Sequence, residues 1–551
     1  MEAQRLVLLV VFSLSVFFLF EAWQKQEQVS NKAGQQKEVT ATTPTPVPGD
    51  ALRSSQTPAQ EPSAPAAVRQ TGKIVTARTD YLIAEIDTLG GTLRRLELLR
   101  HRSTDDQKQN FVLLQSRPDH LYLAQSGLIG VGLPNHQSEY TVVEGPNQLS
   151  EGEDSLAIRL AAPNTGDINV TKIFTFHRSS YVIDVRYEIA NASNAAIKPF
   201  AYYQLVRDDT AAAGDSVLVP TYTGAAVFTD KEKFHKVPFE DFGKVGAHEQ
   251  NSTDGWIAMI QHYFVAAWLP PNGAQREFYT KRLDGNLFAA GLILPIGEIE
   301  PQNQAAISTP LYVGPQESAR LAALAPGLDL TIDYGWLTVI ASPLFWVLAQ
   351  IQKVVVNWGV AIIILTILIK LMFYPLSAAS YRSMAKMRVV TPRLQKLKEQ
   401  YGDDRQRMHQ AMMELYKTEK INPLGGCLPV VVQIPVFIAL YWVLLASVQL
   451  RHAPFALWIQ DLSAPDPYFV LPVLMGLTMI IQSRLNPVPP DPIQAKVMKI
   501  MPIAFSVFFF FFPAGLVLYW LVNNILSIAQ QWYITRDVEQ SKSVTSARAK
   551  R

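Results

Sequence analysis

Residues 354–374 read VVVNWGVAIIILTILIKLMFY, an apolar run in which Lys370 is the only formally charged residue. A helix needs about 20 predominantly apolar residues to cross the hydrocarbon core of a bilayer, so this run is long enough to do so. A lysine at the centre of such a helix costs roughly 2.5–3.5 kcal/mol on insertion scales. The run therefore predicts a membrane-spanning helix whose single charge needs a physical reason.

Two explanations for Lys370 compete. It lies four residues before Tyr374, about 6 Å of helix rise from the end of the run, so its long side chain could snorkel to the headgroups. Alternatively, it faces a wet cavity inside a helix bundle and binds a negatively charged group. The run considered alone slightly favours snorkelling.

Polar residues on other apolar segments bear on this choice. Trp520, Asn524, Ser527 and Gln531 follow i, i+4, i+7 and i+11 spacing, which places one polar stripe along an otherwise apolar helix. Thr366 lies one turn before Lys370, and Gln433 stands between two prolines in another apolar segment. Such side chains face the bundle interior, where they either hydrogen-bond neighbouring helices or line a watery cavity, and the sequence leaves these options about equal.

The N-terminal part contains an apolar run at residues 6–20 and a polar, proline-rich stretch after it. No small-residue cleavage pattern follows Phe20, and Trp23 suits the membrane interface, so we interpret residues 1–24 as a retained signal anchor rather than a cleaved signal peptide. Residues 25–70 include ATTPTPVP at positions 41–48 and are too polar to form a core. They are predicted to be a flexible linker.

Residues 71–327 have the period-two alternation of half-buried antiparallel strands. It is clearest where Ile183, Val185 and Tyr187 alternate with polar residues, and Leu156 and Ile158 repeat it. The length and the turn signals predict one β-sandwich, with a short helix at 315–325.

Apolar segments beyond this domain predict a helical membrane part. Residues 336–347 are too short to cross a bilayer, so we assign residues 328–353 to an interfacial amphipathic helix. Residues 354–536 then form the core, with spans at 354–374, 424–448, 468–482 and 500–529. The last segment is interrupted at its Pro-Ala-Gly sequence and predicts two short helices folded back on each other. The fold class is therefore a membrane protein with five core helices, an N-terminal anchor and a large β-domain.

Basic residues predict the orientation. The loop at 376–422 contains ten, whereas residues 450–467 contain only Arg451. Under the positive-inside rule this loop is cytoplasmic, as are the N-terminus and the basic tail at 537–551, and the β-domain lies outside, in a bacterium the periplasm. The ten residues are Arg382, Lys386, Arg388, Arg393, Lys396, Lys398, Arg405, Arg407, Lys417 and Lys420.

The basic loop also predicts a helical hairpin. Met384, Met387, Met408 and Met412 fall on apolar faces with three-to-four spacing, interrupted at residues 402–404. The loop either only sets the topology, or its exposed methionines dock a partner or a moving peptide.

Composition excludes several classes of function. There are 49 basic and 47 acidic residues, a net charge of +2, which argues against nucleic-acid binding through phosphate neutralisation. Cys427 is the only cysteine, so the chain has no internal disulfide. Motifs for nucleotide phosphate binding, HExxH metal ligation and G-x-S-x-G nucleophiles are absent from the sequence, so no catalytic site, metal or cofactor is expected.

Four long motifs carry a resemblance to a known family. They are YPLSAASYRSMAKMR at 374–388, NPLGGCLPVVVQIPVF at 422–437, FALWIQDLSAPDPY at 455–468 and FPAGLVLYW at 512–520. With them the stretch from residue 358 to 532 resembles the YidC membrane protein insertases of Gram-negative bacteria. The anchor, linker and β-domain match that family's architecture, and the β-domain's own sequence is a weaker signal.

The resemblance implies a five-helix core with a hydrophilic groove around one basic residue, here Lys370. By matching position, Thr366, Gln433, Trp520, Asn524 and Ser527 would line the same groove. The family most often has arginine at the basic position, so Lys370 keeps the charge and loses the planar donor fork. The family's periplasmic domains resemble a sugar-binding supersandwich.

Partners and function follow from the same resemblance. The implied partners are nascent membrane proteins, the Sec translocon, lipid and, weakly, the ribosome through the basic loop and tail. The implied function is insertion and folding of inner-membrane proteins. The main alternative is a small-solute or proton-coupled transporter, although no internal repeat supplies a second lysine-bearing span. Another alternative is an anchored periplasmic enzyme acting on carbohydrate.

Overall fold

The computed structural model describes residues 72–104, 106–164, 167–212, 221–244, 246, 248, 250–402, 404–419, 428–486 and 492–549. The chain forms two compact units, which meet in sequence at Ile332 and Asp333. We call residues 72–332 the β unit and residues 333–549 the helical unit. The predicted anchor, the predicted linker and Cys427 lie outside the described residues.

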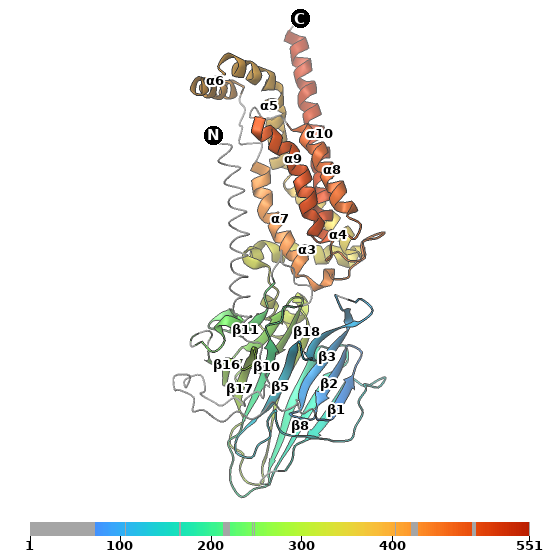
Figure 1. Cartoon of the computed structure of the whole chain (residues 1–551), viewed down its shortest axis with the longest axis vertical. Helices are drawn as coiled ribbons and strands as arrows, with labels where there is room; N and C mark the ends of the chain where they lie inside the picture. The colour runs from blue at the N-terminus through green and yellow to red at the C-terminus, as the bar shows by residue number, and fades with distance from the viewer. Residues whose placement is uncertain are drawn as a thin grey trace. The chain divides into compact units, whose positions relative to one another are not determined.

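The β unit consists of two nine-stranded antiparallel sheets (Figure 1). In spatial order the first contains β1 (Ile74–Arg78), β2 (Leu82–Asp87), β3 (Thr92–Arg102), β4 (Asn110–Ser116), β5 (Leu121–Ile129), β10 (Phe200–Asp208), β17 (Leu287–Pro295), β16 (Arg276–Leu283) and β13 (Asn251–Ser252). The second contains β12 (Lys233–Val237), β11 (Gly224–Thr229), β14 (Trp256–Gln261), β15 (Phe264–Trp268), β18 (Gln304–Pro315), β9 (Val182–Asn191), β8 (Ile168–His177), β7 (Ser155–Ala161) and β6 (Thr141–Val142).

The predicted alternation is confirmed at the strands that carried it. Ile183, Val185 and Tyr187 of β9 are fully buried, as are Leu156 and Ile158 of β7 within a few per cent. In β7 and β9 the side chains on one face therefore form the core and the intervening residues are more exposed, whereas strands such as β11 and β14 are buried on both faces. The β unit is therefore one large β-domain, as predicted.

Lys172 of β8 is buried in this core. Its Nζ donates hydrogen bonds to the carbonyls of Gly91 at 2.7 Å, Gly90 at 3.1 Å and Ser126 at 3.2 Å. The rings of Phe174 and Tyr187 lie 5.2 and 5.4 Å from the ammonium. Because Lys172 belongs to the second sheet and its three acceptors belong to strands or turns of the first, this side chain joins the sheets.

Short helices complete the β unit. They are η2 (Phe239–Asp241), α2 (Ser318–Leu324) and η3 (Leu328–Thr331). The helix predicted at residues 315–325 is α2, which begins three residues later because Pro315 still belongs to β18. Gly327 adopts φ 69° after it, a left-handed conformation that favours glycine.

Among the described residues, the helical unit contains seven α-helices before the final one, α10 (Figure 1). In chain order its described elements are η4 (Gly335–Leu337), α3 (Thr338–Val355), α4 (Trp358–Met372), α5 (Tyr374–Gln400), α6 (Arg405–Thr418), α7 (Leu428–Ala446), η6 (Val448–Leu450), α8 (Val470–Leu485), α9 (Pro492–Phe508), η7 (Phe509–Phe511) and α10 (Ala514–Ala549).

The boundaries of α3 and α4 differ from the prediction. We expected a short helix within 336–347 and a span starting at residue 354, but α3 continues through Pro343 to Val355. Val356 then adopts φ 55°, and the side chain of Asn357 caps α4 by accepting a hydrogen bond from the Val360 amide. An N-cap asparagine inside an apolar run was therefore the helix boundary that hydropathy did not reveal.

Few of the described helices qualify as membrane spans by length and composition. Among the described residues, α3 is long and apolar enough, and α4 with α5 would form a second span if this pair, bent by 67°, were counted as one. The segment Val432–Ala446 of α7 and the helix α8 are apolar and shorter. The predicted number of five core spans therefore stays a prediction.

The end of the chain is also more helical than predicted. The interruption expected in residues 500–529 is present, because α9 and η7 end before Phe512 and α10 begins at Ala514. However, α10 is a helix of 36 residues that includes most of the predicted tail, and not a short helix. Both α9 and α10 pack mainly against α8, and not as a tight pair.

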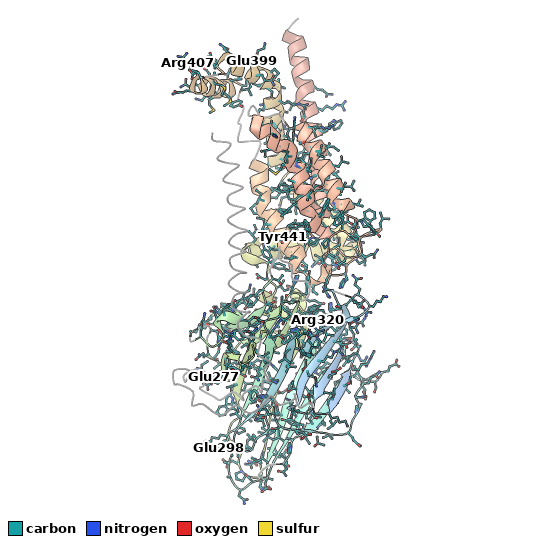
Figure 2. All side chains as sticks on the ribbon, viewed as in Figure 1. Glu277, Glu298, Arg320, Glu399, Arg407 and Tyr441 are labelled. Atoms are coloured by element: carbon teal, nitrogen blue, oxygen red, sulfur yellow. The ribbon has the colours of Figure 1, made fainter. Side chains whose placement is uncertain are left out.

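The predicted helical hairpin is formed by α5 and α6. Val390, Leu394 and Tyr416 make its apolar seam, against which Met387 and Met412 pack. Arg393 of α5 forms an ion pair with Glu419 at 2.6 Å. Charged side chains such as Glu399 and Arg407 project from the hairpin (Figure 2).

Candidate functional site

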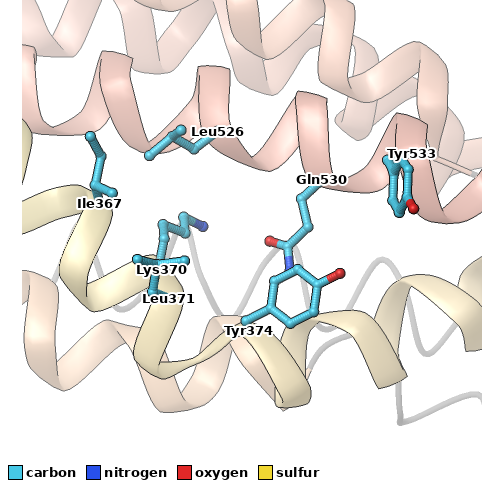
Figure 3. Close-up of a pocket in the computed structure, with 7 residues that line it drawn as sticks. All are labelled: Ile367, Lys370, Leu371, Tyr374, Leu526, Gln530 and Tyr533. Carbon is cyan, nitrogen blue, oxygen red and sulfur yellow. The ribbon is translucent and has the colours of Figure 1, made fainter.

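A pocket of about 270 Å³ lies between α4, the first turn of α5 and α10 (Figure 3). Its apolar wall contains side chains that belong to α4 and α10, and its polar groups come from all three helices. The lining residues are Ile367, Lys370, Leu371, Tyr374, Leu526, Gln530 and Tyr533. Of the residues predicted for a groove, only Lys370 lines this pocket.

Lys370 faces the neighbouring helix α10. It lies in the last turn of α4, where a cation interacts favourably with the helix dipole. Its Nζ donates a hydrogen bond of 2.8 Å to the Ser527 hydroxyl on α10. Snorkelling would point the ammonium away from the neighbouring helix, so this contact supports the interior position and contradicts the snorkelling explanation.

Ser527 connects Lys370 to a longer polar network. Its hydroxyl donates to the backbone carbonyl of Asn523 at 2.6 Å, and the side-chain oxygen of Asn523 accepts a hydrogen bond of 2.6 Å from Gln433 on α7. Three helices, α4, α10 and α7, are thereby joined through side chains. The sequence analysis did not identify Asn523, because the spacing of three and four residues that defined the polar stripe selected its neighbour Asn524.

Of the other predicted groove residues, Thr366, Asn524 and Ser527 are buried, and Gln433 and Trp520 are half-buried. Thr366 is 1 % exposed and donates to the Ile362 carbonyl of its own helix at 2.7 Å. Asn524 donates a long hydrogen bond of 3.5 Å to Thr478 on α8. The Trp520 ring contacts Phe437 at 4.5 Å, and its buried indole nitrogen has no partner among the described residues. The contacts of Asn524 and Trp520 join neighbouring helices, whereas that of Thr366 stays within α4, and a role of these residues in contacting a client stays a prediction.

Three polar pocket residues were absent from the prediction. Gln530 and Tyr533 follow Leu526 at i+4 and i+7, so they form a second row on α10, beside the stripe that we identified. Tyr374 begins α5 immediately after the bend at Phe373. The i+4 row was visible in the sequence, whereas the bend that brings Tyr374 to the same pocket was not.

The hairpin methionines are less exposed than predicted. Met384, Met387, Met408 and Met412 are all half-buried, and two of them pack in the seam of the hairpin. Met413 is 40 % exposed, and it lies next to the predicted position. The hairpin seam therefore uses Met387 and Met412, for which docking of a partner was one of two alternatives.

Comparisons with known proteins identify the family. Residues 74–347 match the family model described as the YidC periplasmic domain, and residues 350–542 match the 60Kd inner membrane protein family. A membrane protein insertase YidC of Nitrosospira multiformis is 57 % identical, and one of Methylobacillus flagellatus is 56 % identical, each over the whole of both chains. The chain belongs to the YidC family of membrane protein insertases.

The solved structures include a YidC insertase with its first transmembrane domain resolved. It is 19 % identical, covers 84 % of this chain and 95 % of its own, and has a TM-score of 0.40. The predicted resemblance to YidC is confirmed by the family models and by the full-length relatives. The transporter alternative is not supported, because the matched families and these relatives are insertases or inner-membrane proteins of the YidC type.

Proposed function

We propose that this YidC-family protein inserts membrane proteins by receiving the polar part of a client segment in the pocket beside Lys370. The observation that carries the proposal is the ammonium of Lys370, which is held by Ser527 inside a helix bundle and opens onto a pocket. No Asp or Glu among the described residues forms an ion pair with it. A cation without a counter-ion among the described residues favours binding of an anionic group. Acidic residues that flank a client's apolar segment provide such a group.

The pocket lowers the main barrier to insertion, which is removal of polar groups from water. A polar group transferred into an apolar medium without a hydrogen bond costs roughly 2–7 kcal/mol. Lys370 and the hydroxyl and amide groups around it replace water for the client's polar stretch. Apolar segments then move sideways along α7 and α9 into lipid, and their hydrophobic transfer drives the reaction without nucleotide hydrolysis.

Short helices support a shortened path across the bilayer. Helix α4 has 15 residues and α8 has 16. At 1.5 Å per residue these helices are about 22–24 Å long, whereas a typical hydrocarbon core is about 30 Å thick. A short hydrophobic stretch is accommodated by local thinning of the bilayer, which shortens the distance that a polar tail must travel.

The proposed topology has an N-terminal anchor and five core spans, with both termini in the cytoplasm and the β unit in the periplasm of a bacterial inner membrane. The basic hairpin of α5 and α6 lies in the cytoplasm and receives the nascent segment first. The β unit acts as a docking platform. Contacts with the Sec translocon and a weak contact of the basic hairpin and tail with the ribosome complete this proposal.

Site-specific crosslinking tests the route. A photo-crosslinker is placed at Leu526 in the pocket, at Met413 on the hairpin and, as a control, at Leu477, an exposed position of α8. Ribosome-bound nascent chains of increasing length are then added. We expect crosslinks first at Met413 and then at Leu526, with Leu477 silent. Crosslinks at Leu477 equal to those at Leu526 would contradict a route through the pocket.

A further inference from the structure

Gln530 places an unsatisfied hydrogen-bond donor in the wall of the Lys370 pocket. Its side-chain nitrogen Nε2 is buried and has no hydrogen-bond partner among the described residues. Figure 3 shows the Gln530 amide and the Lys370 side chain directed into the space between α4 and α10. A buried amide without a partner costs about 1–3 kcal/mol, so its retention needs a reason beyond helix contacts.

The neighbouring residue Gln531 differs from Gln530 in the contacts of its side-chain nitrogen, although its Oε1 is also buried without a partner among the described residues. Its Nε2 donates to the side-chain oxygen of Asn486 at 3.0 Å and to the Leu485 carbonyl at 3.3 Å, which ties α10 to the end of α8. Gln530 makes no such contact through its nitrogen. The two adjacent glutamines therefore have different environments, and only Gln530 faces the pocket.

Lys370 has donor capacity left over in the same pocket. An ammonium has three N–H donors, and its hydrogen bond to Ser527 uses one. Two N–H groups of Lys370 and the amide of Gln530 thus border a space whose other walls include Ile367, Leu371 and Leu526. A pocket that offers several donors, one of them cationic, selects a ligand with two acceptor oxygens and a negative charge.

We propose that Gln530 is a specificity-determining residue that binds one oxygen of a client carboxylate while Lys370 binds the other. This inference rests on the proposed function, because it names the client group that the Lys370 pocket recognises. A lysine alone is a point charge and does not fix the orientation of a carboxylate. Gln530 supplies the second donor, so that Lys370 and Gln530 together act as an arginine fork would act alone.

The test compares two clients in reconstituted vesicles of zwitterionic lipid. One client has Asp and Glu in its translocated tail, and the other has Asn and Gln at the same positions. We expect Gln530→Leu to slow insertion of the acidic client about tenfold more than insertion of the neutral client, the size of one hydrogen bond to a charged group. Adding anionic lipid should not change this ratio, whereas a pocket that binds lipid phosphate would lose the selectivity.

Rescue by arginine separates recognition from structural damage. In the Gln530→Leu background, Lys370→Arg restores both donors from one side chain, so we expect insertion of the acidic client to recover. Gln531→Leu is the matched control, and it should slow both clients equally through loss of its contacts with α8. Equal slowing of both clients by Gln530→Leu, or failure of arginine to rescue, would overturn the inference.

The variant Lys370→Leu distinguishes failure of the role of Gln530 from failure of the proposed function of the pocket. If this variant loses the acidic client and Gln530→Leu does not, the pocket functions and the role of Gln530 is wrong. If neither variant affects the acidic client, the proposed function of the pocket is wrong as well.

Discussion

Lys172 is buried and Lys370 is half-buried, neither has a carboxylate partner among the described residues, and their hydrogen bonds separate their roles. Lys172 uses its three donors on three backbone carbonyls and is 0 % exposed. Lys370 uses one donor and borders a pocket. The first lysine is saturated and joins two sheets, whereas the second retains capacity for a ligand.

Lys172 leads to a prediction about stability and pH. Burial lowers the pKa of Lys172 well below its usual range. Between the folded pKa and the ordinary value of about 10.4, the unfolded chain binds more protons, so the free energy of unfolding rises with pH. We therefore expect the unfolding temperature of the β unit, measured by calorimetry on the full-length protein, to gain a contribution that rises with pH over this range.

Lys172→Met removes that rise and leaves three buried carbonyls without a donor, which costs about 1–3 kcal/mol for each group left unsatisfied. Lys198→Met is the control, since Lys198 lies on the surface beside Glu298 and is 72 % exposed. Parallel stability curves for the wild type and Lys172→Met across this pH range would contradict the prediction.

At the scale of elements, α10 carries two polar rows with different environments. The row of Asn524 and Ser527 is buried among neighbouring helices, whereas the row of Leu526 and Gln530 lines the pocket. Single cysteines at Leu526 and Gln530, in a Cys427→Ser background, should react with a membrane-impermeant thiol reagent added from the cytoplasmic side, because a thiolate forms where water reaches it.

Cysteines at Thr366 and Asn524 should react at least about tenfold more slowly, since both positions are 5 % exposed or less. The rates are measured by mass shift of the labelled protein in inverted vesicles. Faster labelling at Asn524 than at Gln530 would show that water reaches the stripe predicted from the sequence and not the row of Leu526 and Gln530.

Much of the element structure follows from sequence periodicity, and the exceptions have local causes. Alternating residues such as Ile183 and Tyr187 predicted their strands because burial on one face has period two. Asn357 caps the start of α4 inside an apolar run, and hydropathy does not detect such a boundary. The pocket depends on the bend between α4 and α5 and on Gln530, which lies more than 150 residues from Lys370 in sequence. The family resemblance placed Lys370 in a groove, whereas spacing within one helix could not identify the residues that line the pocket with it.

At the scale of the whole molecule, the division into two compact units predicts that their functions are separable. The candidate pocket lies entirely in the helical unit, and its polar network is complete without any residue of the β unit. Deleting residues 73–301, with the anchor and the segment at 328–353 kept, should therefore reduce insertion in vesicles less than about threefold. Complete loss of insertion by a deleted protein whose helices remain folded by circular dichroism would show that the β unit takes part in the reaction.

The central claim is that the charge of Lys370 attracts the client, and charge reversal tests it most directly. Opposite charges about 4 Å apart at an effective dielectric constant of 20 interact by roughly 4 kcal/mol, so changing attraction to repulsion alters a rate by about a hundredfold or more. In reconstituted vesicles, insertion of a client with an acidic translocated tail is measured for Lys370→Glu and Lys370→Arg. We predict that arginine retains insertion, that glutamate abolishes it, and that glutamate accepts the same client once its acidic residues are changed to lysine. Equal insertion of the acidic client with lysine, arginine or glutamate at position 370 would contradict the account.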